Sequence, residues 1–322
     1  MSNSVVTYSP AYTLVPTYEC FNRCSYCNFR VDPGQDQWLT LKSARQKLTQ
    51  LQNSGVIEIL ILSGEVHPHS SRRQVWFEHI YALCELALSM GFLPHTNAGP
   101  LSFDEMARLR QVNVSMGLMV EQTTPQLLET VHRHAPSKLP GLRLEQLDWA
   151  GQLRIPFTTG LLLGLGEIED DWVEALGAIA RLHARYGHIQ EVILQPHSPG
   201  QRQAETGASF SPDQLIQAIH LARAHLPSDV TIQIPPNLVN AEQLRACLTA
   251  GARDLGGIGP MDEVNPDYPH PTAADLAIAI GSKWTLQPRL PVYPHHENWL
   301  GGQVRSRVAH WRQQLPVPSP II

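Results

Sequence analysis

The sequence contains no long hydrophobic run. Its longest apolar segments, such as 56–62 and 160–166, have the length of a strand, whereas a membrane-spanning helix needs about 20 apolar residues. The N-terminal residues also lack a basic stretch followed by an apolar one, which is the pattern of a secretory signal. We therefore expect a cytoplasmic protein that has no membrane partner.

Charge of either sign is scarce. Only 16% of the 322 residues are charged and the formal net charge is −5, so there is no basic excess to bind nucleic acid or an anionic membrane surface. Hydrophobic residues make up 43% of the chain. In a chain of this length that share is enough for a large core, and it excludes an intrinsically disordered protein.

Cysteines are also few, but three of the five, Cys20, Cys24 and Cys27, stand close together. In a reducing compartment, clustered cysteines are more often metal ligands or catalytic groups than disulfides. Their thiolates suit an iron–sulfur cluster or zinc. A structural zinc site takes four ligands, and because no fourth Cys or His follows at zinc-finger spacing, zinc would need a distant histidine. Cys84 and Cys247 stand alone and are expected to be small buried groups on helices.

Apolar runs alternate with segments of helical period along almost the whole chain. We expect eight strands, separated by helices, at 12–17, 56–62, 92–96, 112–120, 156–163, 189–195, 229–234 and 253–257. This alternation predicts parallel strands, and eight units favour an α/β fold of the closed (βα)8 TIM-barrel type over an open doubly wound sheet. We assign residues 1–287 to the barrel and 288–322 to a proline-rich C-terminal extension that packs on it.

The active site of such a barrel lies at the C-terminal ends of its strands. The predicted strands are followed by the cysteine loop and by polar or glycine residues at Ser63, Gly64, Glu65, His95, Asn97, Glu121, Gly164, Glu167, Gln195, His197 and Asn237. We therefore expect these side chains to surround one site.

The spacing Cys20-x3-Cys24-x2-Cys27, with the aromatic Tyr26 before the third cysteine, resembles the signature of the radical S-adenosylmethionine (SAM) superfamily. The resemblance implies a [4Fe–4S] cluster held by these three cysteines, with one open iron. The amine and carboxylate of SAM bind this iron. One electron from the cluster then cleaves SAM to methionine and a 5′-deoxyadenosyl radical, which takes a hydrogen from the substrate.

Other segments resemble the SAM-binding elements of that superfamily. Ser63-Gly64-Glu65 is similar to a Gly-Gly-Glu element that holds the methionine ammonium, although Ser63 replaces the first glycine. The segment 160–167 resembles the motif that lines the adenine, and Glu121 stands where a carboxylate binds the ribose. The resemblance therefore implies SAM contacts from Tyr26, Ser63, Gly64, Glu65, Glu121, Gly160, Leu162, Gly164 and Glu167. If the resemblance is set aside, 63–65 is an ordinary polar turn, 160–167 is a buried strand with a glycine turn, and Glu121 is a solvated loop residue.

Five longer segments, within 8–17, 156–167, 188–195, 232–238 and 254–266, resemble one family within the superfamily. They are similar to the 7,8-didemethyl-8-hydroxy-5-deazariboflavin (FO) synthases, specifically the cyclising (G-type) half of a two-enzyme pair. The resemblance covers about residues 8–275. The sequence departs from the family pattern at 66–69, in a loop near the expected SAM site, and at Ala135, where a serine is expected.

This resemblance implies a radical SAM carbon–nitrogen lyase. A partner (H-type) synthase joins a 4-hydroxybenzyl group to 5-amino-6-(D-ribitylamino)uracil, and the cyclising enzyme closes the deazaflavin ring of this adduct with loss of ammonia. Reduced flavodoxin or ferredoxin is the expected electron donor. Closing a ring inside a barrel also makes physical sense, because the barrel shields radicals from water and orients the reacting groups.

The polyol and the pyrimidine edge of such a substrate call for amide, hydroxyl or imidazole partners at the strand ends. The candidates are Asn97, Thr159, Gln195, His197 and Asn237. For a general acid or base that assists the loss of ammonia, the candidates are His67, His95 and His197, and the sequence does not choose among them. The alternatives are an H-type partner or another radical SAM enzyme, an iron–sulfur electron-transfer protein, and a zinc-stabilised barrel.

Overall fold

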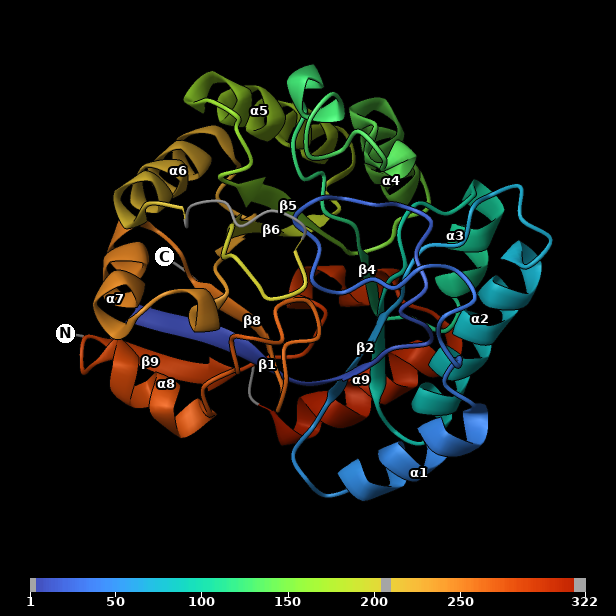
Figure 1. Cartoon of the computed structure of the whole chain (residues 1–322). Coiled ribbons are helices and arrows are strands. Elements are labelled where there is room, and N and C mark those ends of the chain that lie inside the picture. The colour runs from blue at the N-terminus through green and yellow to red at the C-terminus, as the bar shows by residue number, and fades with distance from the viewer. Residues whose placement is uncertain (1–3, 204–209, 316–322) are drawn as a thin grey trace.

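The apolar runs of the sequence form the parallel strands of a closed barrel (Figure 1). The computed structural model describes residues 4–203 and 210–315. The barrel strands are β1 (Ser4–Leu14), β2 (Glu58–Leu62), β3 (Leu93–Asn97), β4 (Ser115–Gly117), β5 (Phe157–Leu163), β6 (Ile189–Pro196), β7 (Thr231–Gln233) and β8 (Asp254–Ile258). β1 pairs with β2 through Tyr12 and Ile59 and with β8 through Thr7 and Asp254, which closes the ring. The predicted (βα)8 fold is confirmed.

Helices surround the barrel and cover its outer face (Figure 1). They are α1 (Leu41–Leu51), α2 (Arg73–Ser89), α3 (Phe103–Leu109), α4 (Pro140–Gln152), α5 (Glu169–Tyr186), α6 (Pro212–His225), α7 (Ala241–Ala250) and α8 (Ala273–Ile280). Side chains that satisfy free backbone N–H groups fix several helix starts. Thr40 accepts from Ser43 N at the start of α1, and Ser102 and Glu105 form a capping box at the start of α3. No helix in the two described ranges is long and apolar enough to cross a membrane.

Two features of the sheet differ from the sequence prediction. The first strand was expected at 12–17, but β1 spans Ser4–Leu14, and the residues after Leu14 already belong to the loop that carries the cysteines. A ninth strand, β9 (Trp284–Pro288), was not predicted. It pairs in parallel with the first half of β1, while β2 pairs with the second half. β1 is long because it pairs first with β9 and then with β2 along its length.

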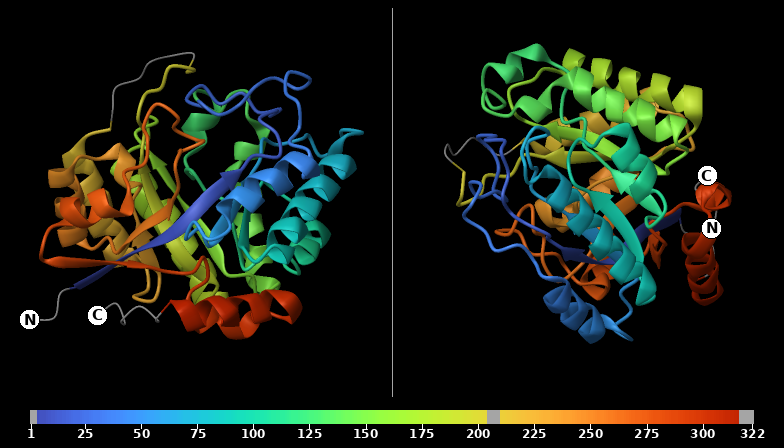
Figure 2. Two further views of the ribbon diagram at one scale, coloured as in Figure 1. Left: turned by 90° about the horizontal axis from the view of Figure 1, so that it is seen from below. Right: turned by 90° about the vertical axis from the view of Figure 1, so that its right-hand side faces the viewer.

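The segment after β9 closes the end of the barrel that lies opposite the cysteine loop (Figure 2). It contains the short 3₁₀ helix η4 (Pro294–Trp299) and the helix α9 (Gly302–Gln314). Leu290, Val292, Val304 and Val308 pack there against the barrel residues Ile57, Leu93 and Val114 in a separate apolar cluster. This contact leaves the cysteine end of the barrel as the open one.

Candidate active site

The loop between β1 and α1 carries the three clustered cysteines and is organised by a buried glutamate. The Glu19 carboxylate accepts hydrogen bonds from Gly34 N at 2.7 Å and Trp38 Nε1 at 3.2 Å. It also pairs with Arg72 at the start of α2, with 2.8 Å between Nη1 and Oε2. One carboxylate thus joins both ends of the loop to the neighbouring helix, and its position fixes the path of the chain through the cysteines.

Cys20, Cys24 and Cys27 line one cavity of about 320 Å³ at the C-terminal ends of the strands, which we call the upper cavity. None of the three forms a disulfide. Asn22 donates toward the Cys20 sulfur across 3.7 Å, and Cys27 N donates to Cys24 O at 3.2 Å. Within the described ranges, no group of three or more Cys, His, Asp or Glu side chains is arranged around a single metal ion. The arrangement brings three soft ligands to one hollow, as a polynuclear cluster requires.

The segment after β2 lies directly against this loop. Gly64 N donates to Thr17 O at 2.8 Å, and Phe21 N donates to Glu65 O at 3.0 Å. A Cβ at position 64 would lie 2.2 Å from the Glu19 carbonyl oxygen, so only glycine fits there. The Glu65 carboxylate lines the upper cavity and accepts from Asn22 Nδ2 at 2.9 Å. Ser63 also lines this cavity.

The cationic residues of the upper cavity were not predicted, and two of them pair with its carboxylates. Lys138 forms an ion pair with Glu121, and Arg143 lies 3.8 Å from Glu121 and 3.4 Å from Glu65. Burial alone would raise the pKa of Glu121, but the charges of Lys138 and Arg143 outweigh it and lower that pKa. Glu121 has a left-handed backbone, with φ of 67°, which a non-glycine residue adopts only at a cost. The cavity therefore combines two carboxylates and three cationic residues, Arg30, Lys138 and Arg143, beside the cysteines.

The residues predicted on and after β5 divide into two groups. Leu162 lines the upper cavity. Gly160 lines neither cavity, but it packs so closely on β6 that a Cβ there would lie 2.3 Å from Ile193 O. Glu167 instead accepts hydrogen bonds within its own loop, from Gly164 N at 2.6 Å and Trp172 Nε1 at 3.0 Å. Neither Glu167 nor Gly164 lines the cavity, so the role of this carboxylate is to hold the loop that follows β5.

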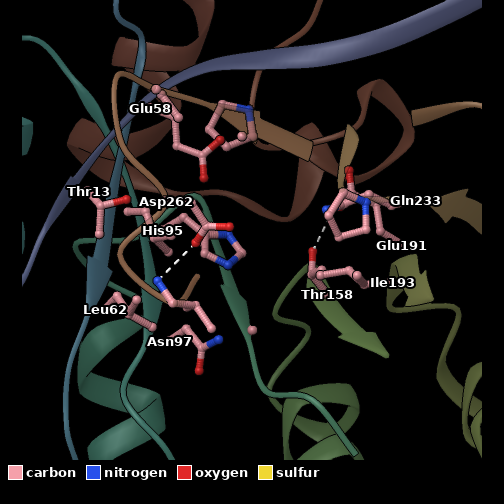
Figure 3. A pocket seen from close by; sticks show the side chains of 18 of the residues that line it. Thr13, Glu58, Leu62, His95, Asn97, Thr158, Glu191, Ile193, Gln233 and Asp262 are labelled. Atoms are coloured by element: carbon pink, nitrogen blue, oxygen red, sulfur yellow. Dashed lines mark hydrogen bonds between the residues drawn. The ribbon is translucent and has the colours of Figure 1, made fainter. Parts of the chain in front are cut away.

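A second cavity, of about 190 Å³, runs along the barrel axis, and we call it the axial cavity (Figure 3). Asn97 and Gln195 line both cavities, so they lie where the two meet. Thr159 lies outside both. It is fully buried and points to the helices, because alternate strand residues face opposite sides, and its neighbour Thr158 lines the axial cavity instead. Asn237 is also outside both and donates to Asp262 Oδ2 and Tyr268 O, each at 2.8 Å.

The histidine candidates occupy three different places. His67 is exposed and lies in an outer depression next to Phe21, away from both cavities. His197 lines the upper cavity with only 7% of its surface exposed, and neither ring nitrogen has a hydrogen-bond partner among the described residues. His95 lines the axial cavity. Tyr26 lines the upper cavity, and its hydroxyl lies 3.0 Å from His132 Nε2.

The hydrogen bonds around His95 determine its tautomer. The Ser115 hydroxyl donates to the Pro291 carbonyl oxygen at 2.6 Å, because a carbonyl only accepts. The same hydroxyl lies 2.7 Å from His95 Nδ1 and, having used its proton, must accept from it. Burial lowers the pKa of His95 to about 3, with a further contribution from Arg289, so the ring is neutral at pH 7. Nδ1 therefore carries the proton, and Nε2 is a hydrogen-bond acceptor.

Comparisons with known proteins agree with this geometry. Residues 14–179 match the family described as the radical SAM superfamily. The chain is 65% identical over 314 residues to a 7,8-didemethyl-8-hydroxy-5-deazariboflavin synthase of Trichormus variabilis, covering 97% of this chain and 92% of the relative. It is also 65% identical over 314 residues to the protein of the same name from a Nostoc species, covering 97% and 93%.

A solved structure has the same fold. The crystal structure of HydG, a maturase of the [FeFe]-hydrogenase, superposes with a TM-score of 0.76 over 95% of this chain and 70% of that one, at 14% sequence identity. At that identity the likeness concerns the barrel architecture alone.

Proposed function

The chain belongs to the family of 7,8-didemethyl-8-hydroxy-5-deazariboflavin synthases within the radical SAM superfamily, and from this premise we propose that it is the cyclising (G-type) enzyme. Its substrate is the adduct of a 4-hydroxybenzyl group with 5-amino-6-(D-ribitylamino)uracil. It closes the central ring with loss of ammonia, which makes it a carbon–nitrogen lyase. An H-type partner synthase supplies the adduct, and reduced flavodoxin or ferredoxin supplies the electron.

The residues of the cysteine loop fit a [4Fe–4S] cluster. Three thiols face one hollow, so that three irons would have a protein ligand and the fourth would stay open. The cluster, when bound, supplies the electron that cleaves SAM into methionine and the hydrogen-abstracting deoxyadenosyl radical. Asn22 supports this role of the loop, since it donates both toward Cys20 and to Glu65. The same side chain thus links a cluster ligand to a carboxylate of the SAM site.

The charged groups of the upper cavity fit the zwitterionic methionine end and the ribose of SAM. The Glu65 carboxylate suits the ammonium, while Lys138 and Arg143 suit the carboxylate of SAM. Glu121, held by those two cations, stays ionised and accepts from the ribose hydroxyls. Gly64 keeps the segment that carries Glu65 in contact with the cysteine loop, because any larger residue would meet the Glu19 carbonyl group.

The substrate then occupies the axial cavity and reaches the upper one where Asn97 and Gln195 lie. Both amides can donate and accept, as the edge of a pyrimidine requires. Of the three histidine candidates, we assign the proton transfer that accompanies loss of ammonia to His197. It faces the upper cavity with both ring nitrogens unbonded among the described residues, whereas His67 lies in the outer depression.

The observation that carries the proposal is the convergence of Cys20, Cys24 and Cys27 with Glu65 and Glu121 on one cavity. Its test is anaerobic reconstitution with iron and sulfide of the wild type, Cys24→Ala and Cys247→Ala. Cys247 is buried on α7, so its variant is the matched control. We expect Cys24→Ala to lose 5′-deoxyadenosine formation and Cys247→Ala to keep it. Full activity in Cys24→Ala would refute the proposal.

A second assay separates the cyclising enzyme from its partner type. The reconstituted enzyme is given reductant and SAM, and then either tyrosine with the ribityl diamine or the adduct made by a partner synthase. A cyclising enzyme forms fluorescent product only from the adduct. Consumption of tyrosine by this chain alone would instead assign it the H-type reaction.

A further inference from the structure

The lower part of the axial cavity contains polar groups that the SAM site does not use. Figure 3 shows Glu58, His95, Thr158 and Glu191, from four different strands, around the same space. Glu58 opens β2, and Glu191 reaches the interior because β6 carries an extra residue there: Phe157 pairs with Ile189, but Thr158 pairs with Glu191. These groups form a floor beneath the junction of the two cavities.

The floor presents hydrogen-bond acceptors to the cavity. Glu58 is 7% exposed, its carboxylate points into the cavity (Figure 3), and no cation of the described residues forms an ion pair with it. His95 Nε2 is an acceptor by its tautomer, and among the described residues no protein group donates to it. Two buried acceptors from neighbouring strands thus face the same space with free lone pairs.

Three donor side chains beside these acceptors, those of Arg289, Thr158 and Gln190, already have partners. Arg289 donates through Nε and Nη2 to Asp254, at 2.6 and 2.8 Å, and through Nη1 to Leu290 O at 3.1 Å. The Thr158 hydroxyl donates to Glu191 at 3.1 Å, and the Gln190 amide donates to Pro291 O at 3.0 Å. A ligand that fits this floor must therefore bring donors of its own, since buried acceptors without a donor are costly.

Two glycines keep the space beside these acceptors open. A Cβ at Gly117 would lie 2.9 Å from His95 Nε2, and a Cβ at Gly257 would lie 3.9 Å from the Glu58 carboxylate. A side chain at Gly117 would occupy the space next to His95 Nε2, and one at Gly257 would narrow the space beside Glu58. The floor is therefore shaped to admit a narrow chain next to both groups.

We propose that this floor binds the polyhydroxylated side chain of the substrate, with Glu58 and His95 accepting from its hydroxyl groups. The assignment rests on the proposed function and adds the orientation of the substrate to it. A polyol is narrow, uncharged and rich in O–H donors. The phenol end has one donor on a wide apolar ring, and the pyrimidine edge needs donors as well as acceptors, which Asn97 and Gln195 supply at the junction. The rings then lie toward the upper cavity and the polyol points away from it.

The test compares two ligands that differ only in this side chain. The probes are the ribityl deazaflavin product and its analogue with a methyl group in place of the ribityl chain. Their binding to the reconstituted enzyme with SAM is followed anaerobically by deazaflavin fluorescence. A hydrogen bond to a charged group contributes about 1.5–3 kcal/mol, so we expect the wild type to prefer the ribityl ligand by about tenfold or more.

Substitutions then show which residues cause the preference for the ribityl ligand. Glu58→Leu should lose most of it, and Glu58→Gln, which keeps an acceptor oxygen and the size of the side chain, should keep part of it. Ser115→Ala removes the partner that holds the His95 proton on Nδ1, and should reduce the preference without touching the ligand. Glu263→Gln is the matched control, because Glu263 lines the same cavity but its carboxylate bonds the Tyr18 hydroxyl at 2.7 Å. A thermal melt of each variant checks that it is folded.

The outcomes separate this inference from the proposed function. Equal binding of both ligands by the wild type would overturn the inference and leave the proposed function standing. Loss of the preference in Glu263→Gln but not in the Glu58 variants would also overturn it, because the polyol would then lie near Glu263. Binding of neither ligand would overturn both proposals.

Discussion

Arg289 and Asp254 form a bidentate ion pair inside the barrel, with 2.6 Å between Nε and Oδ2 and 2.8 Å between Nη2 and Oδ1. Asp254 is the first residue of β8, and Arg289 directly follows β9. Arg289 also pairs with Glu191 of β6. A residue from the C-terminal segment therefore neutralises carboxylates that belong to the barrel wall, which links the last strand to the interior.

The first prediction is that Arg289→Leu destabilises the fold by about 3–5 kcal/mol, because it leaves Asp254 and Glu191 buried without their cation. Arg289→Lys should cost less, since it keeps the charge but loses the bidentate geometry. The free energy of unfolding is measured in urea under anaerobic conditions. Arg305→Leu, at an exposed position of α9, is the control. An Arg289→Leu variant as stable as the control would show that the pair contributes little.

The sequence predicted the barrel but not this closure. Strands such as 156–163 are short, mostly apolar segments bounded by turn residues, and β5 at Phe157–Leu163 agrees closely. The segment of β9, Trp-Thr-Leu-Gln-Pro, is not mostly apolar and stands next to a proline-rich stretch, so no strand is expected there. Its pairing with β1 depends on a contact between residues about 280 positions apart. A local pattern carries no signal for such a pairing.

The candidate site was predicted only as far as local motifs extend. The cysteines and Glu65 stand next to strand ends, and the structure brings them to one cavity. Lys138 and Arg143 enter it from the loop and helix after β4. The prediction considered only residues that directly follow a strand, so it did not include them. Thr158 and Thr159 are adjacent and identical, and β5 is buried on both faces, so the sequence shows no alternation that tells which of the two faces the interior.

The second prediction concerns Lys138. Lys138→Met leaves the buried Glu121 with Arg143 as its remaining cation, at 3.8 Å, and removes a partner for the carboxylate of SAM. We expect the dissociation constant of SAM to rise about tenfold, as the loss of one charge-assisted hydrogen bond implies. Equilibrium dialysis of the reconstituted enzyme measures it. Lys42→Met, at an exposed position of α1, should bind SAM as the wild type does, and an equal affinity in both variants would exclude Lys138 from the SAM site.

The third prediction compares two glycines. A Cβ at Gly64 would lie 2.2 Å from a backbone oxygen of the cysteine loop, whereas one at Gly141 of α4 meets nothing within 4 Å. Gly64→Ala must therefore push the segment that carries Glu65 away from the cysteines, and we expect it to lower both cluster content and SAM binding. Gly141→Ala should retain both. Iron and sulfide analysis after reconstitution measures the cluster, and full cluster content in Gly64→Ala would show that the two segments can separate without harm.

The fourth prediction is a pH dependence of stability that arises from Glu191. Burial raises the pKa of this carboxyl from its ordinary value of 4.5 to about 7. Arg289 opposes that rise, Asp254 and Glu58 add to it as like charges, and the hydrogen bond from Thr158 opposes it. Because the folded protein holds this proton more tightly than the unfolded chain, the stabilising contribution is complete below about pH 4.5. It is lost as the pH rises toward 7.

The difference in unfolding free energy between the wild type and Glu191→Gln isolates this contribution. Glutamine does not titrate, so the wild type should lose stability relative to the variant between about pH 4.5 and 7, and the difference should be constant above that range. Buried histidines act in the opposite direction in both proteins. Burial lowers the pKa of His95 to about 3 and that of His296 to about 4, so each favours unfolding as the pH falls below 6.5. These contributions cancel in the difference, and a difference that does not change with pH would mean that Glu191 is ionised throughout.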